Sequence, residues 1–386
     1  MVLFFEDHLT HYRVPVLEQL QNTLGENLVV IHGSPYAGAA LNTASPEDTL
    51  PFEHFKVPTW WIRGQTLSLR AVWKHLGRYE PSVILVRGTI RNIELFPLLF
   101  YARVRGIPVI TWGQAYSRRR PFRPYRHPID RAYLAVVQLS DAYVCYTNEI
   151  RSTLTQYVSR SKLFVANNTL DTTKHSHIRN KLSELKKENV RESLGLDDKP
   201  HICFIGRLQP RKKVGQLIEA HHLLKVQHGL EVGLVIVGDG PEKEALAQKA
   251  IDLGSSDVHF VGAKYGESAG RYLYASDLVV IPGWLGLAVN HALIYGRPVV
   301  SQYAGEKQYH KEELVGHPPE ATHIQPGQNG VFAKHNSSSS LANKIVEVMS
   351  NNEHYITEAE RYAVSHLTIE SMINGFQEAI RYATSR

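Results

Sequence analysis

Two cationic residues follow a segment that reads as a buried strand. Arg207 comes directly after HICFIG, and Lys212 stands at the start of the next helical pattern. The first turn of a helix leaves backbone N–H groups unpaired and attracts anions, and guanidinium and ammonium groups nearby add full positive charges. This spacing predicts a site for a diphosphate, although an ordinary surface charge is the alternative for either residue taken alone.

A second anion site is predicted within residues 281–300, IPGWLGLAVNHALIYGRPVV. The segment reads as the end of a buried strand that breaks at Gly283, a tight turn through Gly286 and a helix that stops at Gly296. The backbone N–H groups of Gly286 and Leu287 would bind a phosphate there without help from an acid.

Glycines are expected in the loops that neighbour these two sites. Gly206 ends the strand before Arg207, Gly238 lies in the turn of VIVGDGPEKEAL, and Gly262 ends the apolar run VHFVG. Glycine lets a ligand approach the backbone closely. Any tight turn between a strand and a helix can have the same composition, so each glycine taken alone is weak evidence for a ligand site.

Alternating apolar runs and helical patterns must position these residues. Runs of four to six residues, such as VLFF, SVILV and AYVCYT, alternate with amphipathic segments, and a second series of this kind opens at HICFIG. The alternation is typical of βαβ units, in which ligands bind beyond the carboxyl ends of parallel strands. The sequence therefore predicts an α/β protein with two Rossmann-like, doubly wound domains that face each other across a cleft.

The boundaries of these domains follow from a polar stretch without any strand pattern. We expect a first domain at residues 1–168, an inter-domain connection at 169–198 and a second domain at 199–365. A length of 386 residues suits two cores of this size. The last helical segment, 366–386, follows the second sheet and is a candidate for crossing back onto the first domain.

The composition is typical of a folded soluble protein. Hydrophobic residues make up 43% and charged residues 21% of the chain, and the longest apolar run, IELFPLLFYA, is too short to span a membrane. Cys145 and Cys203 lie inside apolar runs, which is typical of buried thiols rather than a disulfide framework. With no signal-peptide pattern at the start, a cytoplasmic location is expected.

Basic charge gathers in one region of the first half. Nine arginines stand between Val86 and His127 against one acid, Glu94. The loop of residues 118–127 is a candidate for contact with the inner face of a membrane or with the phosphates of a lipid-linked acceptor. A solvated loop is the plain alternative, and nucleic acid is not an expected partner.

Taken in order, these motifs resemble those of family 4 of the glycosyltransferases, which are retaining enzymes with the GT-B fold. FIGRLQPRKKVGQLIEA is similar to the family's GRL segment and its downstream lysine, and VGDGPEKEAL, VHFVGAKY, YASDLVVIPG and PGQNGVFAKHN follow at the expected intervals. The first half resembles the family only in organisation and at HYRVPVLEQL. The resemblance implies that Arg207 and Lys212 bind the diphosphate of a nucleotide-sugar donor, with Lys213 in place of the usual glycine.

The resemblance also implies a set of residues that line the donor. These are Gly206, Gly238, Gly262, Gly283, Trp284, Leu285, Gly286, Leu287 and His291. No metal and no cofactor other than the donor substrate is expected, because the family's enzymes of this fold act without metal and the sequence shows no tight cluster of metal ligands.

The sequence departs from the family's Glu-x7-Glu pattern, in which one acid contacts the donor sugar and the other the ribose. Gly283 and His291 stand at these two positions, a version similar to that of some bacterial members. A neutral imidazole offers one acceptor and one donor, whereas a carboxylate accepts from two hydroxyls. The hypothesis is that His291 hydrogen-bonds a ribose or sugar hydroxyl, and that the backbone N–H groups of residues 284–286 replace the first acid. A satisfied core histidine is the alternative.

Candidates in the first half stand where predicted strands end. EDHLTHYRVP places His8 and His11 after the first strand and Arg13 at a helix start. In the family this loop borders the donor phosphates and the reacting sugar, which makes His11 a catalytic candidate and His8 and Arg13 candidates for the cleft or the acceptor. Gln114 stands where members often carry a histidine, and it cannot exchange a proton at neutral pH. Each of these residues could instead only cap a helix.

The expected function is transfer of a sugar, with retention, from a nucleoside diphosphate sugar to a glycan or lipid-linked acceptor, in cell-surface polysaccharide synthesis. Arg207, Lys212 and the helix start near Gly286 would stabilise the departing diphosphate. The alternatives are a non-catalytic partner protein of the same fold and a sugar-nucleotide epimerase or phosphorylase. A dehydrogenase is disfavoured, because no G-x-G-x-x-G with a downstream acid follows the first strand of either half.

Overall fold

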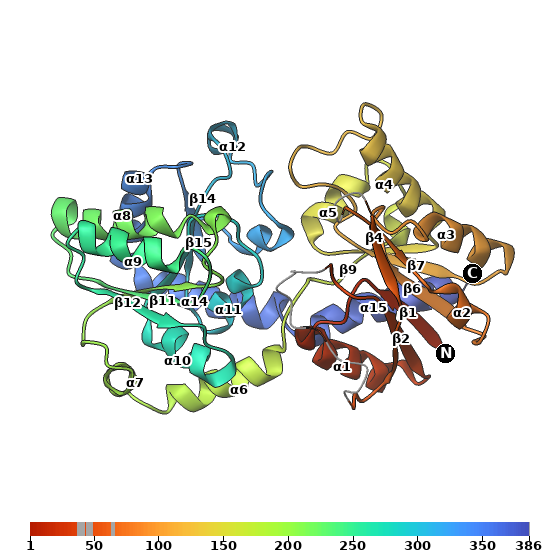
Figure 1. The fold of residues 1–386 in the computed structure, drawn as a ribbon, viewed down its shortest axis with the longest axis horizontal. Helices are drawn as coiled ribbons and strands as arrows, with labels where there is room; N and C mark the ends of the chain where they lie inside the picture. Colours follow the sequence, from red (N-terminus) through yellow and green to blue (C-terminus); the bar gives the residue numbers. More distant parts are fainter. Residues whose placement is uncertain (37–42, 44–48, 63–65, 386) are drawn as a thin grey trace. The chain divides into compact units, whose positions relative to one another are not determined.

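The structure is a computed structural model that describes residues 1–36, 43, 49–62 and 66–385. The chain divides into two compact units (Figure 1). Unit 1 consists of Met1–Ser117, Pro121–Asp171 and Ile369–Arg386, and unit 2 consists of Arg118–Arg120 and Thr172–Thr368. The sheet of unit 1 is therefore built from the first half of the chain, while a helix near residue 386 completes its core.

Unit 1 contains a seven-stranded parallel sheet with the order β3-β2-β1-β6-β7-β8-β9. Its strands are β1 (Val2–Glu6), β2 (Leu28–His32), β3 (Glu53–Lys56), β6 (Val83–Arg87), β7 (Val109–Gly113), β8 (Ala142–Cys145) and β9 (Leu163–Val165). Val2 of β1 pairs with Leu28 on one side and with Val83 on the other. The strand order therefore reverses between β1 and β6, and doubly wound sheets bind their ligands beyond the carboxyl ends of the strands at such a reversal.

Helices cover both faces of this sheet because the strands are apolar on both sides. Residues of α2 (Trp73–Leu76) and α3 (Leu95–Val104) pack against Leu3, Phe5 and Ile84. The other face packs against α1 (Val14–Leu24), α5 (Asn148–Leu154) and α15 (Ile369–Thr384), while α4 (Pro128–Leu139) contributes to both clusters. Short 3₁₀ segments occur at His11–Arg13 and Arg160–Lys162.

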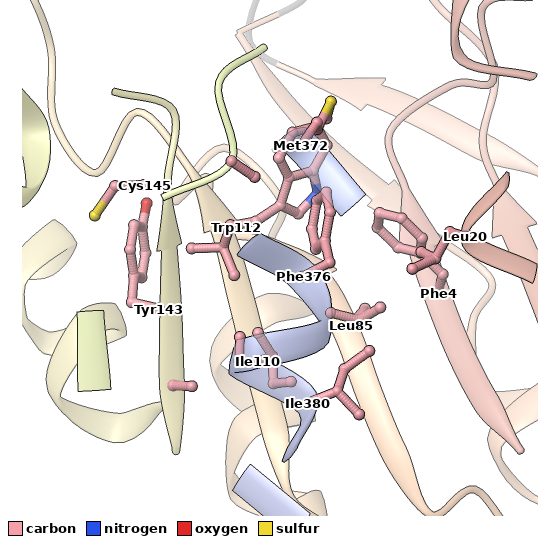
Figure 2. Close-up of a cluster of buried hydrophobic side chains, with 14 of the residues drawn as sticks. Phe4, Leu20, Leu85, Ile110, Trp112, Tyr143, Cys145, Met372, Phe376 and Ile380 are labelled. Atoms are coloured by element: carbon pink, nitrogen blue, oxygen red, sulfur yellow. The ribbon is translucent and has the colours of Figure 1, made fainter. Parts of the chain in front are cut away.

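The packing of α15 closes the core of unit 1 (Figure 2). Met372, Phe376 and Ile380 recur on one face of the helix and are buried, as expected for an amphipathic helix that lies on a sheet. The ring of Phe376 lies 5.3 Å from that of Trp112. Gly375 meets β9 so closely that an added Cβ would lie 2.0 Å from the carbonyl oxygen of Val165, so only glycine allows this approach.

A two-stranded antiparallel sheet, β4 (Thr59–Ile62) and β5 (Leu67–Arg70), lies next to the main sheet of unit 1. Its position is fixed by Ser68, whose N–H donates to the carbonyl of Arg91 at 2.9 Å. The buried Nε of Arg70 donates to Glu94 at 2.5 Å. These bonds attach the hairpin to the start of α3.

Unit 2 contains a six-stranded parallel sheet with the order β12-β11-β10-β13-β14-β15. Its strands are β10 (His201–Ile205), β11 (Gly233–Val237), β12 (Val258–Gly262), β13 (Leu278–Ile281), β14 (Val299–Gln302) and β15 (Gly330–Ala333). The strand order reverses between β10 and β13. The loops that follow these two strands therefore flank the position at which doubly wound sheets bind their ligands.

The helices of unit 2 lie on both sides of this sheet, with α8, α9 and α13 on one side and α10 and α11 on the other (Figure 1). They are α6 (Thr172–Ser183), α7 (Lys187–Ser193), α8 (Val214–His228), α9 (Lys243–Asp252), α10 (Gly266–Ala275), α11 (Ala288–Ile294), α12 (Glu306–Lys311), α13 (Ser338–Ser350) and α14 (Asn352–His366), with 3₁₀ segments at Pro210–Lys212 and Pro319–His323. The two parallel sheets and their covering helices confirm the predicted α/β class with Rossmann-like units.

Two smaller expectations from composition can be compared with the structure. Cys145 and Cys203 are both buried and unpaired, as predicted. Within the described part of the chain, no helix has both the length and the apolar character that crossing a bilayer requires.

Candidate functional site

The cations and the glycine turn predicted from the sequence meet at the strand-order reversal of unit 2. The loop after β10 carries Arg207 and the 3₁₀ turn Pro210–Lys212, and the loop after β13 carries residues 282–287. The Nζ of Lys212 donates to the carbonyl oxygens of Trp284 at 2.6 Å and Leu285 at 2.8 Å. The Lys212 side chain thereby joins the two loops.

Backbone hydrogen bonds strengthen this junction. The N–H of Gly283 donates to the carbonyl of Lys212 at 3.0 Å, and the N–H of Trp284 donates to the carbonyl of Arg211 at 2.8 Å. A Cβ on Gly283 would lie 2.1 Å from the latter oxygen, so a glycine is needed at this position. The N–H of Trp284 is therefore already used within unit 2, which leaves those of residues 285 and 286 for the contact that the hypothesis assigns to this turn.

Three backbone N–H groups of the turn remain available to a ligand. Those of Leu285, Gly286 and Leu287 donate to no acceptor in the described part of the chain, and α11 begins directly after them. Gly286 has a φ of +108°, a conformation that L side chains rarely adopt. With the carbonyls of residues 284 and 285 held by an ammonium group, the turn offers unpaired donors, which is the chemistry that an anion requires.

Arg207 is exposed at the end of β10, and none of the described residues forms an ion pair or hydrogen bond with its guanidinium. Its backbone is nonetheless fixed on both sides. The N–H of Gly206 donates to Val237 at 3.0 Å, and that of the fully buried Leu208 donates to Asp239 at 2.9 Å. The structure therefore presents an unpaired cation on a rigid support beside the Lys212 loop.

The three glycines predicted after neighbouring strands lie next to one another in the sheet. The N–H of Gly238 donates to the carbonyl of Gly262 at 2.9 Å, and a Cβ on Gly238 would lie 1.9 Å from the carbonyl oxygen of Gly206. The loops after β10, β11 and β12 thus pack backbone against backbone. This close packing requires a glycine at position 238, while Gly262 has a φ of +74°, which favours glycine.

The charge state of Lys212 follows from its surroundings. Only 9% of the residue is exposed. Burial, with a further contribution from Arg211, lowers the pKa of the Lys212 ammonium to about 8, against an opposing effect of Glu320. A diphosphate brought to this position would favour the charged form, so binding of an anion and protonation of Lys212 are coupled.

His291 lies on α11, partly buried, with its ring 4.7 Å from that of His175 on α6. Burial, followed by the effect of His175, lowers the pKa of His291 to about 3. The imidazole is therefore neutral near pH 7 and has one donor and one acceptor, as the hypothesis for a ribose or sugar contact requires. Its contact with His175 is also the packing that a core histidine makes.

The predicted residues of the first half lie in unit 1, at the carboxyl ends of β1 and β7. His8 follows β1, where burial lowers the pKa of its imidazole, and His11 and Gln114 are exposed. Arg13 is different. Its guanidinium is buried, donates to Asn168 and lies 4.7 Å from the centre of the Trp112 ring, so its contacts are within unit 1.

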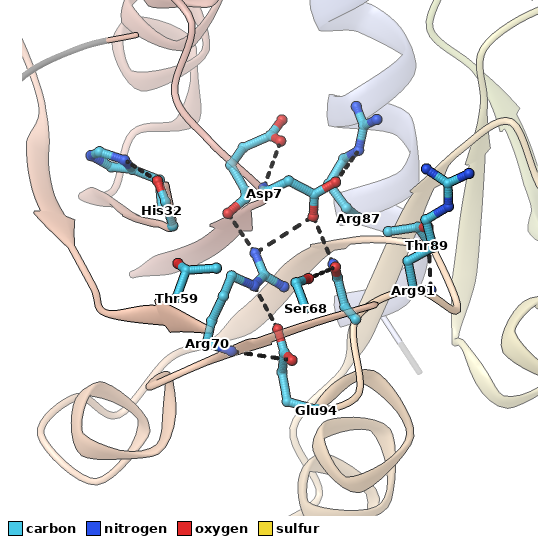
Figure 3. Close-up of polar contacts among 12 residues, drawn as sticks. Asp7, His32, Thr59, Ser68, Arg70, Arg87, Thr89, Arg91 and Glu94 are labelled. Atoms are coloured by element: carbon cyan, nitrogen blue, oxygen red, sulfur yellow. Dashed lines mark hydrogen bonds and ion pairs between the residues drawn. The ribbon is translucent and has the colours of Figure 1, made fainter. Parts of the chain in front are cut away.

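Sequence reasoning missed a set of charged residues at the same edge of unit 1 (Figure 3). Asp7 lies between Arg70 and Arg87, with carboxylate oxygens 3.7 Å and 3.8 Å from their guanidinium nitrogens. Although burial opposes the effect, Arg87 and Arg70 lower the pKa of Asp7. The neighbouring Glu6 is buried, and burial raises its pKa. The sequence shows only that two acids, Glu6 and Asp7, stand at the end of the first strand, while their charge partners come from distant segments.

Residues 118–120 of the arginine loop belong to unit 2, and residues 121–127 belong to unit 1. Arg118 is buried in unit 2, where its Nε donates to the carbonyl of His317 at 3.3 Å, so it is not an exposed cation. Arg123 and Arg126 are exposed in unit 1 and line a surface pocket together with Tyr125 and Tyr157. Across the described residues, no three His, Cys, Asp or Glu side chains gather as ligands of a metal ion would.

Comparison with known proteins gives related folds and one matching family model. Residues 199–351 match the model described as "Glycosyl transferases group 1". A curated relative, the alpha-D-kanosaminyltransferase of Streptomyces kanamyceticus, is 31% identical over 123 residues, which is 31% of this chain. The match spans 32% of the relative, so this chain covers about a third of that protein's length.

Solved structures resemble the chain over nearly its whole length. Anabaena Alr3699/HepE in complex with UDP has a TM-score of 0.69 at 16% identity, covering 98% of this chain and 99% of the other. The lipopolysaccharide outer core galactosyltransferase WaaB has a TM-score of 0.64 at 14% identity, again covering 98% and 99%. At these identities the likeness establishes the fold, which is GT-B.

Proposed function

Because residues 199–351 match the group 1 glycosyl transferases within a GT-B fold, we propose that the chain transfers a sugar from a nucleoside diphosphate sugar to a hydroxyl of a glycan or lipid-linked acceptor. The observation that carries this proposal is the junction at the strand-order reversal of unit 2. There Lys212 joins two loops that together offer an exposed, unpaired Arg207 and the unpaired N–H groups of residues 285–287.

These groups suit the diphosphate of the donor. Negative charge develops on the departing diphosphate as the bond to the sugar breaks, so fixed donors at that position lower the barrier. Two of the three N–H bonds of the Lys212 ammonium are used by carbonyl oxygens, and the third remains for a phosphate oxygen. Arg207 adds a charge that no side chain in the described part of the protein neutralises.

The transfer step proposed is a front-face substitution. The bond between the anomeric carbon and the phosphate oxygen breaks, the acceptor oxygen bonds to the same face of the sugar, and the acceptor's proton goes to the leaving phosphate. Retention of configuration follows, and neither a metal ion nor a protein base is part of the proposal. Gln114 fits this scheme, because an amide at that position cannot take a proton.

The acceptor is proposed to bind at the carboxyl edge of the sheet of unit 1. Asp7, His8 and Arg87 lie there and provide acceptors and donors for sugar hydroxyls, with the exposed His11 nearby in the same loop. The structural relatives include a lipopolysaccharide galactosyltransferase. Cell-surface polysaccharide synthesis is therefore the proposed setting.

A donor panel tests the proposal. The melting temperature of the protein would be measured with UDP-, GDP- and TDP-sugars and with NAD, and the release of nucleoside diphosphate would be followed by coupled assay. We expect one class of nucleoside diphosphate sugar to stabilise the protein and to be consumed slowly. Stabilisation by NAD alone, or by no nucleotide, would contradict the proposal, and binding without turnover in the presence of acceptor extracts would favour a non-catalytic partner protein.

A further inference from the structure

The helix α3 exposes a stripe of large apolar side chains. Phe96, Phe100 and Val104 are 37%, 73% and 69% exposed, and their spacing of four residues places them on one side of the helix. The opposite side, which includes Leu95 and Leu98, is buried against the sheet of unit 1. A surface helix of a globular protein normally has a polar outer side, so this one requires an explanation.

Neighbouring elements extend the stripe into a patch. Ile93, just before α3, is 42% exposed, and Trp73 of α2 is 42% exposed with its ring 6.0 Å from that of Tyr101 on α3. The N–H of Ile93 donates to Ser68 in the hairpin, which attaches the hairpin to this end of the helix. We define the α3 face as Trp73, Ile93, Phe96, Phe100 and Val104.

The α3 face differs from the exposed apolar residues of unit 2. In unit 2 such residues stand singly, each on a different element, and they are Leu185, Val226, Ile251, Tyr265, Tyr309 and Val364. Single exposed apolar residues are normal on protein surfaces, whereas a contiguous patch indicates an interaction surface.

Positive charge predominates on the segments that carry the α3 face. Residues 57–107 include eight lysines and arginines but only two acids, Glu80 and Glu94. Glu94 is buried and paired with Arg70, so it does not offset the charge at the surface. The exposed cations on these elements are Lys74, Arg78, Arg91, Arg103 and Arg105. The partner of this face must therefore combine an apolar layer with negative charge.

We propose that the α3 face docks on the surface of an anionic lipid bilayer. Tryptophan and phenylalanine side chains partition into the boundary between headgroups and acyl chains, and arginines at the rim of the patch bind lipid phosphates. A second copy of the chain fits less well, because a symmetric contact would place Arg103 and Arg105 near the same cations of the other copy without acids to pair with them. The inference goes beyond the proposed function and does not depend on it.

Sedimentation with vesicles tests the proposal. Wild-type protein would be mixed with vesicles of phosphatidylglycerol and phosphatidylcholine, or of phosphatidylcholine alone. We expect binding to the anionic vesicles only, weakened by 1 M salt. The double variant Phe100→Ser/Val104→Ser should bind about tenfold less, since binding scales with buried apolar area. The variant Arg103→Glu/Arg105→Glu should lose more than about tenfold, because each cation near an anionic surface strengthens binding several-fold.

The matched control is Val226→Ser/Ile251→Ser, which removes two apolar side chains of similar exposure, 65% and 70%, from unit 2. Its vesicle binding should equal that of the wild type. Absence of binding to anionic vesicles, equal binding to neutral ones, or equal losses in the control and the Phe100/Val104 variant would overturn the proposal. So would a wild-type dimer in sedimentation velocity that the Phe100/Val104 variant converts to a monomer while vesicle binding is unchanged. Melting shifts with nucleotide sugars, measured on the same variants, test the proposed function separately.

Discussion

The Nζ of Lys212 lies 2.8 Å from the carbonyl oxygen of Leu285, which is 73 residues further along the chain. This contact fixes the loop after β10 to the loop after β13, so the cations of the first and the unpaired N–H groups of the second keep one mutual arrangement before any ligand binds. Groups that are already in place cost no reorganisation energy when charge develops on a leaving group.

The charge of Lys212 should make donor affinity depend on pH. Because its pKa in the free protein is about 8, and an anion favours the charged form, affinity for a nucleoside diphosphate should fall as the pH rises above 8, approaching tenfold per pH unit. Calorimetric titrations between pH 7 and 9.5 measure this. In Lys212→Met the affinity should be weaker throughout and nearly independent of pH.

Lys213→Gln is the matched control for Lys212, since Lys213 is the neighbouring lysine and its Nζ donates to Asn336 instead of the turn. This variant should retain the decline above pH 8. The same pH profile in Lys212→Met as in the wild type would show that the ammonium of Lys212 does not contact the donor.

Replacement of Arg207 should affect binding but not folding. Its guanidinium is exposed and has no partner among the described residues, so Arg207→Ala should change the free energy of unfolding by less than about 0.5 kcal/mol. Donor affinity should fall about 10- to 100-fold, the size of a lost charged hydrogen bond to phosphate. Urea unfolding and a donor titration on one preparation check both parts.

Lys225→Ala serves as a control for Arg207, because this lysine of α8 is 64% exposed and belongs to the same unit. Its donor affinity should be that of the wild type. If Arg207→Ala binds donor as tightly as this control, the proposed diphosphate site is in the wrong place.

Gly283 is predicted to be indispensable to the junction. In Gly283→Ala the new Cβ would lie 2.1 Å from the carbonyl oxygen of Arg211, and the two loops would have to separate. We expect a loss of about 1–3 kcal/mol in the free energy of unfolding and weaker donor binding. In Gly215→Ala, the control, the Cβ only reaches ordinary contact with the side chain of Lys249 at 3.6 Å, so stability should be unchanged or slightly raised. Equal stability of the two variants would argue against a rigid junction.

His291 should make the folded state sensitive to acid. Its pKa is about 3 in the folded protein and about 6.5 when unfolded, so only the unfolded chain takes up this proton as the pH falls below 6.5. Titration of His291 therefore does not lower the free energy of unfolding above pH 6.5, and lowers it progressively from there towards pH 3. The loss is about 2 kcal/mol at pH 5. His291→Asn should therefore lose less stability than the wild type between pH 7 and pH 5.

The variant His310→Asn is the control for His291→Asn, because His310 lies on α12 and is 66% exposed. Its stability should follow the wild-type pH dependence. Other buried histidines with lowered pKa values, such as His317 and His323, contribute to every variant alike, so the difference between curves isolates His291. Parallel curves for His291→Asn and the wild type would mean that its imidazole titrates normally.

The parallel sheets and the placement of Arg207 and Lys212 were predictable because they depend on local pattern. Continuous apolar runs fix the strands, and a short spacing after β10 fixes both cations at one edge. The hydrogen bonds of Lys212 and the used N–H of Trp284 were not predictable, since they arise where loops about 70 residues apart approach each other. The burial of Arg13 depends in the same way on Asn168, which comes from a distant loop.

Other features were missed for different reasons. The hairpin of β4 and β5 forms a separate two-stranded sheet, and its short alternating segments carry little signal beside the long apolar runs of the main sheet. Asp7 became informative only when Arg70 and Arg87 were placed on either side of it. Charge partners of this kind come from tertiary structure and leave no mark in sequence spacing.

The packing of α15 has a consequence for biosynthesis. Phe376 and Ile380 cover Trp112 and its neighbours, yet they are translated after all of unit 2. While the ribosome is still making unit 2, the part of the first sheet that α15 covers is therefore exposed, and the nascent polypeptide carries an unfinished domain until its last helix is made. Loss of residues 369–386, by an early stop codon or by proteolysis, would therefore damage the half of the protein that was translated first.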